Sequence, residues 1–236
     1  MRRVLILQAG SADPALRARY GDYPDWFARH LAPRVELRVV RPYEQVLPSS
    51  AGFDGLVMTG SPKSVLVPEP WMEESAAFLL EAARTRPVLG VCFGHQLLAR
   101  ALGGRVELNP RGREAGTAAV RFTPDGERDP LFAGLASPLL AQQTHEDHVA
   151  ALPAGATLLA ENEMTPVQAF AWGEFIRCVQ FHPEFDAERS RMLAEVRRER
   201  LDLQAPGGAA AVRASIRDTP EATSLLGRWL THFVGA

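Results

Sequence analysis

Residues 87–104 (PVLGVCFGHQLLARALGG) decide the fold of this chain. The stretch begins as a short apolar run, continues from Gln96 with helical spacing, and stops at a glycine pair typical of helix C-termini. We therefore predict a buried strand that turns sharply into a helix, with Cys92 at the turn. Gly90 and Gly94 flank Cys92 with the spacing of the G-x-S-x-G nucleophile elbow, with sulfur in place of oxygen.

Cys92 at such a turn would have the surroundings of a reactive cysteine. Small residues on both sides let the strand and the helix approach closely while the turn residue adopts a strained backbone. The N-terminus of the following helix would stabilise a thiolate, which is the reactive form of cysteine. A buried structural cysteine is the alternative interpretation, because free cysteine is among the most buried residue types.

Length and composition favour one large α/β domain. The 236 residues are enough for a full core, and the net charge of −2 argues against nucleic acid or an anionic membrane as the main partner. The sequence contains no run of about 18 apolar residues, so it predicts no membrane helix. The apolar start of the chain is too short for a signal peptide, and two cysteines, Cys92 and Cys178, make no disulfide framework. A cytoplasmic location fits these features best.

The first half of the chain alternates short apolar runs with helical segments. This alternation predicts parallel strands with helices on both faces of the sheet. The expected strands are 4–7, 35–40, 53–58 and 88–91, and the expected helices are 24–31, 70–85 and 96–102. Because sites form at the carboxyl ends of such strands, residues 59–62 and Cys92 should converge.

After Gly104 the pattern changes to short strands separated by turns, with a hairpin around Glu174. This region predicts an antiparallel portion added to the mostly parallel sheet. A charged helix over 187–199, a break at 204–208 and a last helix follow. We expect a single domain over 1–236, with a core of about 1–186 and a helical extension over 187–236. The expected strands are 106–108, 118–122, 157–160, 168–172 and 175–181.

His182 is the best candidate for the base that a nucleophilic cysteine needs. It follows an apolar strand, and Glu184 lies two residues later, on the same side of an extended segment. Glu184 could therefore orient the imidazole and stabilise its cation. An exposed turn at a strand end is the alternative. His30 and His232 lie in expected amphipathic helices, and the side chain of His95 should point away from the nucleophile.

Residues 90–96 (GVCFGHQ) and 180–185 (QFHPEF) together resemble the class I glutamine amidotransferases, most closely the amidotransferase domain of GMP synthase and its free-standing relatives. The resemblance covers roughly residues 1–185. It implies a flavodoxin-like fold and a Cys92–His182–Glu184 triad. That triad would hydrolyse the side-chain amide of glutamine to glutamate and ammonia through a γ-glutamyl thioester.

The resemblance also implies an oxyanion hole and a substrate site. The backbone N–H of Phe93 would be one oxyanion donor, and the loop containing Gly60 and Ser61 would supply the other. Ser61 stands where the family has a second glycine. Gln96 matches the family position that helps bind glutamine.

Residues 143–149 match the family loop that lines the γ-glutamyl site, so that Thr144, His145, Glu146 and Asp147 become expected substrate-binding residues. Glu146 replaces a small residue, and its carboxylate could favour the substrate's α-ammonium group or face solvent. His145, Asp147 and His148 also resemble metal ligands, but no further His or Cys lies at zinc spacing. We expect no metal and no cofactor.

The resemblance also implies delivery of ammonia to a synthetase, either fused or separate, and this sequence shows no such acceptor part. It has no G-x-x-x-x-G-K-[ST] loop, and the segment after Phe185 is too short for an ATP-pyrophosphatase domain. We expect a free-standing hydrolase acting on glutamine or another γ-glutamyl small molecule. A separate synthetase subunit and a homodimer stay open. The alternatives are a γ-glutamyl peptidase and a non-catalytic amidotransferase-like subunit.

Overall fold

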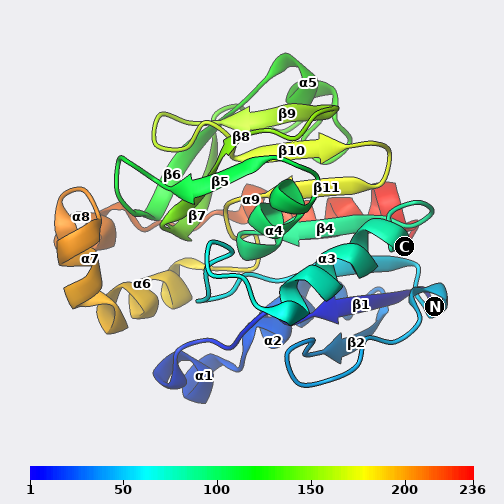
Figure 1. The fold of residues 1–236 in the computed structure, drawn as a ribbon. Helices are drawn as coiled ribbons and strands as arrows, with labels where there is room; N and C mark the ends of the chain where they lie inside the picture. Colours follow the sequence, from blue (N-terminus) through cyan, green and yellow to red (C-terminus); the bar gives the residue numbers. More distant parts are fainter.

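A nine-stranded mixed sheet runs through the centre of the molecule in the computed structural model, which describes residues 1–236 (Figure 1). Its order is β2–β1–β3–β4–β11–β10–β9–β6–β7. The first five strands are parallel, and the other four join antiparallel. The parallel strands are β1 (Arg3–Leu7), β2 (Glu36–Val40), β3 (Gly55–Met58), β4 (Val88–Val91) and β11 (Ile176–Val179). The others are β6 (Glu114–Phe122), β7 (Leu139–His145), β9 (Ala156–Glu161) and β10 (Ala169–Trp172).

Helices cover both faces of the sheet, because the central strands are apolar on both sides. In β1, Val4 and Ile6 join the core beneath two helices, and Leu5 and Leu7 join the core beneath two others. All four side chains are fully buried, and each such burial stabilises the fold by roughly 1.5–3 kcal/mol. The first pair of helices is α2 (Tyr23–Leu31) and α9 (Pro220–Trp229), and the second is α3 (Pro70–Ala82) and α4 (Phe93–Ala101).

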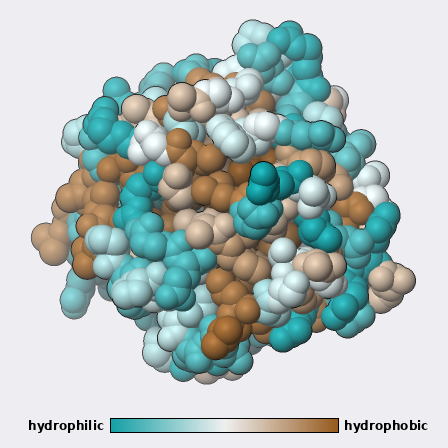
Figure 2. Space-filling view, turned by 45° about the vertical axis from the view of Figure 1, so that its right-hand side comes forward, coloured by the Kyte–Doolittle hydropathy of each residue, from teal (hydrophilic) through white to brown (hydrophobic).

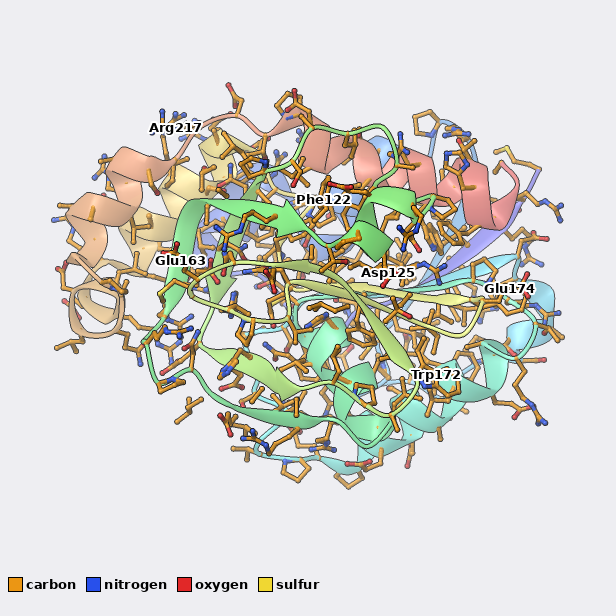
Figure 3. The ribbon with its side chains drawn as sticks, turned by 90° about the horizontal axis from the view of Figure 1, so that it is seen from above. Phe122, Asp125, Glu163, Trp172, Glu174 and Arg217 are labelled. Carbon is orange, nitrogen blue, oxygen red and sulfur yellow. The ribbon has the colours of Figure 1, made fainter.

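The carboxyl ends of the parallel strands lie at one edge of the molecule, and the later helices gather beside that edge (Figure 1). Figure 3 shows Trp172, the last residue of β10, and Glu174, in the β10–β11 turn, at the opposite end of the sheet. The helices beside the carboxyl edge are α1 (Pro14–Tyr20), α6 (Ala187–Val196), α7 (Arg198–Gln204) and α8 (Gly208–Ser215). The remaining elements are α5 (Pro124–Arg128), the short turns Ser50–Gly52 and Leu230–Val234, and a two-stranded sheet of β5 (Arg105–Leu108) and β8 (Asp147–Ala151).

The predicted fold class and the β10–β11 hairpin are confirmed, but the region after Gly104 contains more strand than expected. Residues 143–149 were expected to form a loop, and they instead form the end of β7 and the start of β8. Gln142 and Gln143 are buried in β7 although their side chains are polar. This strand therefore lacks the alternation of apolar and polar residues by which a strand is usually predicted from sequence. β6 starts at Glu114 rather than Ala118 for the same reason, since Glu114 is buried.

The helix expected over 187–199 is interrupted, which corrects that prediction. α6 ends at Val196, and Arg197 (φ −105°, ψ 16°) leaves the helical conformation before α7 begins. The expected break at 204–208 separates α7 from α8, with Gly207 in the left-handed region at φ 74°. The chain therefore folds back on itself twice beside the carboxyl edge before α9 returns across the sheet.

The surface carries both hydrophilic and hydrophobic residues. Figure 2 shows hydrophilic and hydrophobic residues interspersed over the face that it presents. No helix combines the length and the apolar character needed to cross a bilayer.

We predict that Gly94→Ala destabilises the fold. A Cβ atom on Gly94 would lie 2.5 Å from the carbonyl oxygen of Met58, a backbone atom that cannot move aside cheaply. The free energy of unfolding, measured by urea denaturation, should fall by about 1–3 kcal/mol, the usual cost of overpacking. Gly52→Ala is the control, because its nearest contact would be a flexible Arg3 nitrogen at 3.6 Å. Equal stability of Gly94→Ala and the unmodified chain would contradict this account.

Candidate active site

Cys92 lies at a strained turn between β4 and α4. Its φ of 51° and ψ of −100° make it the only non-glycine residue with positive φ in the chain. A Cβ atom on Gly90 would lie 2.8 Å from the carbonyl oxygen of Gly94, so a small residue is required there. Strained backbone of this kind persists only where the surrounding structure enforces it. The close approach that was expected from the two glycines is therefore present.

His182 and Glu184 follow the strand next to Cys92. In the parallel register of β4 and β11, Val91 pairs with Val179, so both chains leave the sheet side by side. The His182 N–H donates to the carbonyl of Gln142 at 2.9 Å. The Nδ1 atom of His182 lies 2.7 Å from Oε1 of Glu184, and both side chains are buried.

The other edge of the His182 ring faces the nucleophile. Its Nε2 atom has no nitrogen or oxygen partner. A Cβ atom on Gly60 would lie 2.8 Å from Cε1 of His182 and 3.6 Å from Cβ of Cys92, so the three residues crowd together. Cys92 raises the pKa of the His182 imidazole, both by its charge and as a hydrogen-bond partner of the ring.

Neighbouring charged groups determine the protonation state of His182. Burial by itself lowers the pKa of this imidazole, but the Glu184 carboxylate and Cys92 outweigh burial and raise the pKa to about 10. His95 shows the opposite result, since burial lowers its pKa to about 3 and no carboxylate compensates. His95 packs on Phe170 and stays neutral. Burial raises the pKa of the Cys178 thiol, which keeps that second cysteine unreactive.

The backbone donors expected of the oxyanion hole are unpaired beside Cys92. The N–H groups of Gly60, Ser61 and Phe93 donate to no group within the chain. The Ser61 hydroxyl donates to the carbonyl of Ala9 at 2.9 Å and accepts from the N–H of Lys63 at 3.1 Å. Its side chain is therefore held by neighbouring loops, and the serine in place of glycine leaves the backbone donor available.

A cavity of about 310 Å³ opens beside Cys92. It brings together all five residues that the sequence indicated as substrate-binding. The amide nitrogen of Gln96 is already engaged, because it donates to the carbonyl of Asp147 at 2.8 Å and to Oε1 of Gln180 at 3.1 Å. The predicted residues that line the cavity are Ser61, Gln96, Thr144, His145, Glu146 and Asp147.

A buried carboxylate that sequence reasoning missed holds His145, one of the residues that line the cavity. Glu114 contacts Nε2 of His145 at 3.1 Å, and the other ring nitrogen lies 2.9 Å from the carbonyl of Asp147. Burial raises the pKa of Glu114, but hydrogen bonds from His145 and from side chains that include Thr165 outweigh it and lower the pKa. His145 thus holds the β7–β8 turn. No three His, Cys, Asp or Glu side chains cluster in a way that could hold a metal ion.

Glu146 lines the cavity and also has an ionic partner, which the sequence did not indicate. Its carboxylate pairs with the buried guanidinium of Arg113 and accepts from Nε2 of Gln204 at 2.9 Å. The C-terminal helices therefore reach the site directly. Arg197 also does so, since its Nη1 donates to the hydroxyl of Thr144 at 3.1 Å. No motif marks Arg113, Arg197 or Gln204 in the sequence.

Comparison with known proteins identifies relatives of this chain. The model of the glutamine amidotransferase class-I family matches residues 23–195. γ-Glutamyl peptidase 3 of Arabidopsis thaliana is 31% identical over 140 residues, which cover 58% of this chain and 56% of that protein. The glutamine-hydrolyzing GMP synthase of Thermomicrobium roseum is 36% identical over 171 residues, covering 69% of this chain and 30% of that one. The matches thus span about half or less of these relatives' length.

Solved structures share the fold across the whole chain. The crystal structure of a glutamine amidotransferase from Thermotoga maritima superposes with a TM-score of 0.79. It covers 100% of this chain and 99% of its own at 21% sequence identity. At that identity the likeness shows a common fold.

We predict that His182 makes the stability of the fold depend on pH. Its pKa rises from 6.5 to about 10 on folding, so the imidazolium stabilises the fold fully below pH 6.5 and progressively less as the pH approaches 10. The difference in unfolding free energy between the unmodified chain and His182→Gln should therefore shrink over that range. Urea denaturation at several pH values measures it. Exposed His232→Gln is the control, and a pH-independent difference for His182→Gln would overturn the prediction.

Proposed function

Since this chain belongs to the class I glutamine amidotransferase family, we propose that it hydrolyses γ-glutamyl amides with a Cys92–His182–Glu184 triad. The observation that carries the proposal is the buried 2.7 Å contact between His182 and Glu184, with the free edge of the ring turned to Cys92. An orienting carboxylate, a base and a nucleophile are the parts that acyl transfer requires.

In the first proposed step, the Cys92 thiolate attacks the γ-carboxamide carbon of the substrate. A C–S bond forms, and the carbonyl oxygen becomes an oxyanion. The N–H groups of Phe93 and Ser61 are the proposed donors to that oxyanion, each worth about 3 kcal/mol of transition-state stabilisation. The His182 imidazolium then gives its proton to the leaving nitrogen as the C–N bond breaks, which leaves a γ-glutamyl thioester.

In the second proposed step, water replaces the departed amine. Neutral His182 removes a proton from the water, whose oxygen attacks the thioester carbon. The C–S bond breaks, glutamate leaves, and the proton on His182 restores the thiolate–imidazolium pair. Glu184 holds the ring through Nδ1 in both steps and stabilises its cation.

Glutamine is the simplest proposed substrate, with ammonia as the leaving group. The family assignment supports it, and so does the relative named a glutamine-hydrolyzing GMP synthase. A separate synthetase subunit that receives the ammonia is part of this proposal. A homodimer stays a prediction.

A γ-glutamyl peptidase is the second candidate, with the same acyl half and a different leaving amine. The similarity to γ-glutamyl peptidase 3 favours it. So does a wide outer groove of about 810 Å³, which shares Pro62, Arg197 and Arg200 with the cavity beside Cys92. A leaving group larger than ammonia would have room there. A non-catalytic subunit is the remaining alternative, and it predicts no acylation of Cys92.

We predict that Cys92→Ala abolishes release of glutamate and ammonia from glutamine or a γ-glutamyl dipeptide, with kcat falling by about 10⁴-fold or more. A glutamine-like electrophile should label Cys92 and be blocked by substrate. Cys178→Ala is the matched control, because that thiol is buried in the core. It should keep both the labelling and the activity. The proposal would be contradicted if Cys92 were not labelled and neither substrate were hydrolysed.

A further inference from the structure

Arg197 occupies a position between the nucleophile and the outer surface. It lies at the break between α6 and α7, and its bond to Thr144 ties the guanidinium to the end of β7. It borders the 310 Å³ cavity beside Cys92, a smaller space that contains His182, and the outer groove. Arg197 is thus the one residue that lines all three spaces.

Positive charge in the cavity exceeds what its carboxylates neutralise. Three guanidinium groups line the cavity, and only Arg113 has an ionic partner, Glu146. Arg197 and Arg200 make no ion pair. Burial lowers the pKa of Arg113, and the positive charges of Arg200 and Arg197 lower it further, while Glu146 raises it. The three guanidinium groups are therefore close enough to repel one another.

The other charged groups of the cavity and groove are already bonded or lie farther out. Lys63 pairs with Glu69, and the Asp147 carboxylate bonds the hydroxyl of Ser64. Three carboxylates remain. Glu195, which pairs with Arg198 and Arg213, and Glu199 border only the outer groove. Asp13 borders both the groove and the small space that contains His182, and its side chain caps α1 by accepting from the N–H of Ala15.

We propose that Arg197 and Arg200 bind a carboxylate on the leaving amine, so that the preferred substrates are γ-glutamyl amino acids or peptides rather than neutral amides. This inference rests on the proposed function and, of its two candidate substrates, selects the γ-glutamyl peptide over glutamine. His182 must reach the leaving nitrogen to protonate it, and Arg197 lines the small space on the His182 side of Cys92, which Gln96 and Asp147 do not line. A guanidinium matches a carboxylate through two parallel N–H donors.

The test compares two substrates that differ in one charge: γ-glutamylglycine, whose leaving amine carries a carboxylate, and γ-glutamylglycinamide, whose leaving amine is neutral. We expect the unmodified chain to favour the glycine compound at least tenfold in kcat/KM. In Arg197→Gln and in Arg200→Gln that preference should fall at least fivefold, mainly through KM. Arg198→Gln, which removes the neighbouring charge that Glu195 already pairs, should keep the preference.

Two results would overturn the inference. One is a preference near unity in the unmodified chain. The other is an equal loss for both compounds in Arg197→Gln and Arg200→Gln, which would assign the arginines to the α-carboxylate that both substrates share. Hydrolysis of both compounds without preference leaves the proposed function standing. Failure to hydrolyse either one, with no acylation of Cys92, removes the proposed function itself.

Discussion

The close approach of α4 to β3 and β4 is the constraint on which the rest of the structure depends. Gly90 and Gly94 leave no room for a Cβ atom, and this contact forces Cys92 into a positive φ. The fold tolerates the strain because both strands are buried beneath helices. The same turn places the thiol at the carboxyl edge of the sheet, where the neighbouring strand β11 ends and His182 follows. Packing thus places the proposed nucleophile.

Buried charge is the second organising feature, and each buried carboxylate of the site has a partner. Glu184 contacts His182, and Glu114 contacts His145. An unpaired charge at such depth would cost several kcal/mol, so the partners must fold together. Because Glu114 belongs to β6 and His145 to the end of β7, the antiparallel half of the sheet sets the shape of the cavity whose nucleophile comes from the parallel half.

Much of the fold could be predicted because its signals are local. The apolar runs before Cys92 and His182, and the glycines around Cys92, report strands and a turn within a few residues. β7 could not be predicted in the same way, because Gln142 and Gln143 are buried there by hydrogen bonds rather than by apolar contact. The break at Arg197 has no proline or glycine to mark it.

The sequence by itself indicated the family, the alternation of parallel strands with helices in the first half and the three residues of the proposed triad, since each of these signals lies within a short stretch of the chain. Only the tertiary structure decided what surrounds them. Arg113 meets Glu146, and Arg197 meets Thr144, across 33 and 53 positions of sequence. No periodicity or spacing encodes such pairs, because they arise when separate helices and strands pack against one another and bring their charges together.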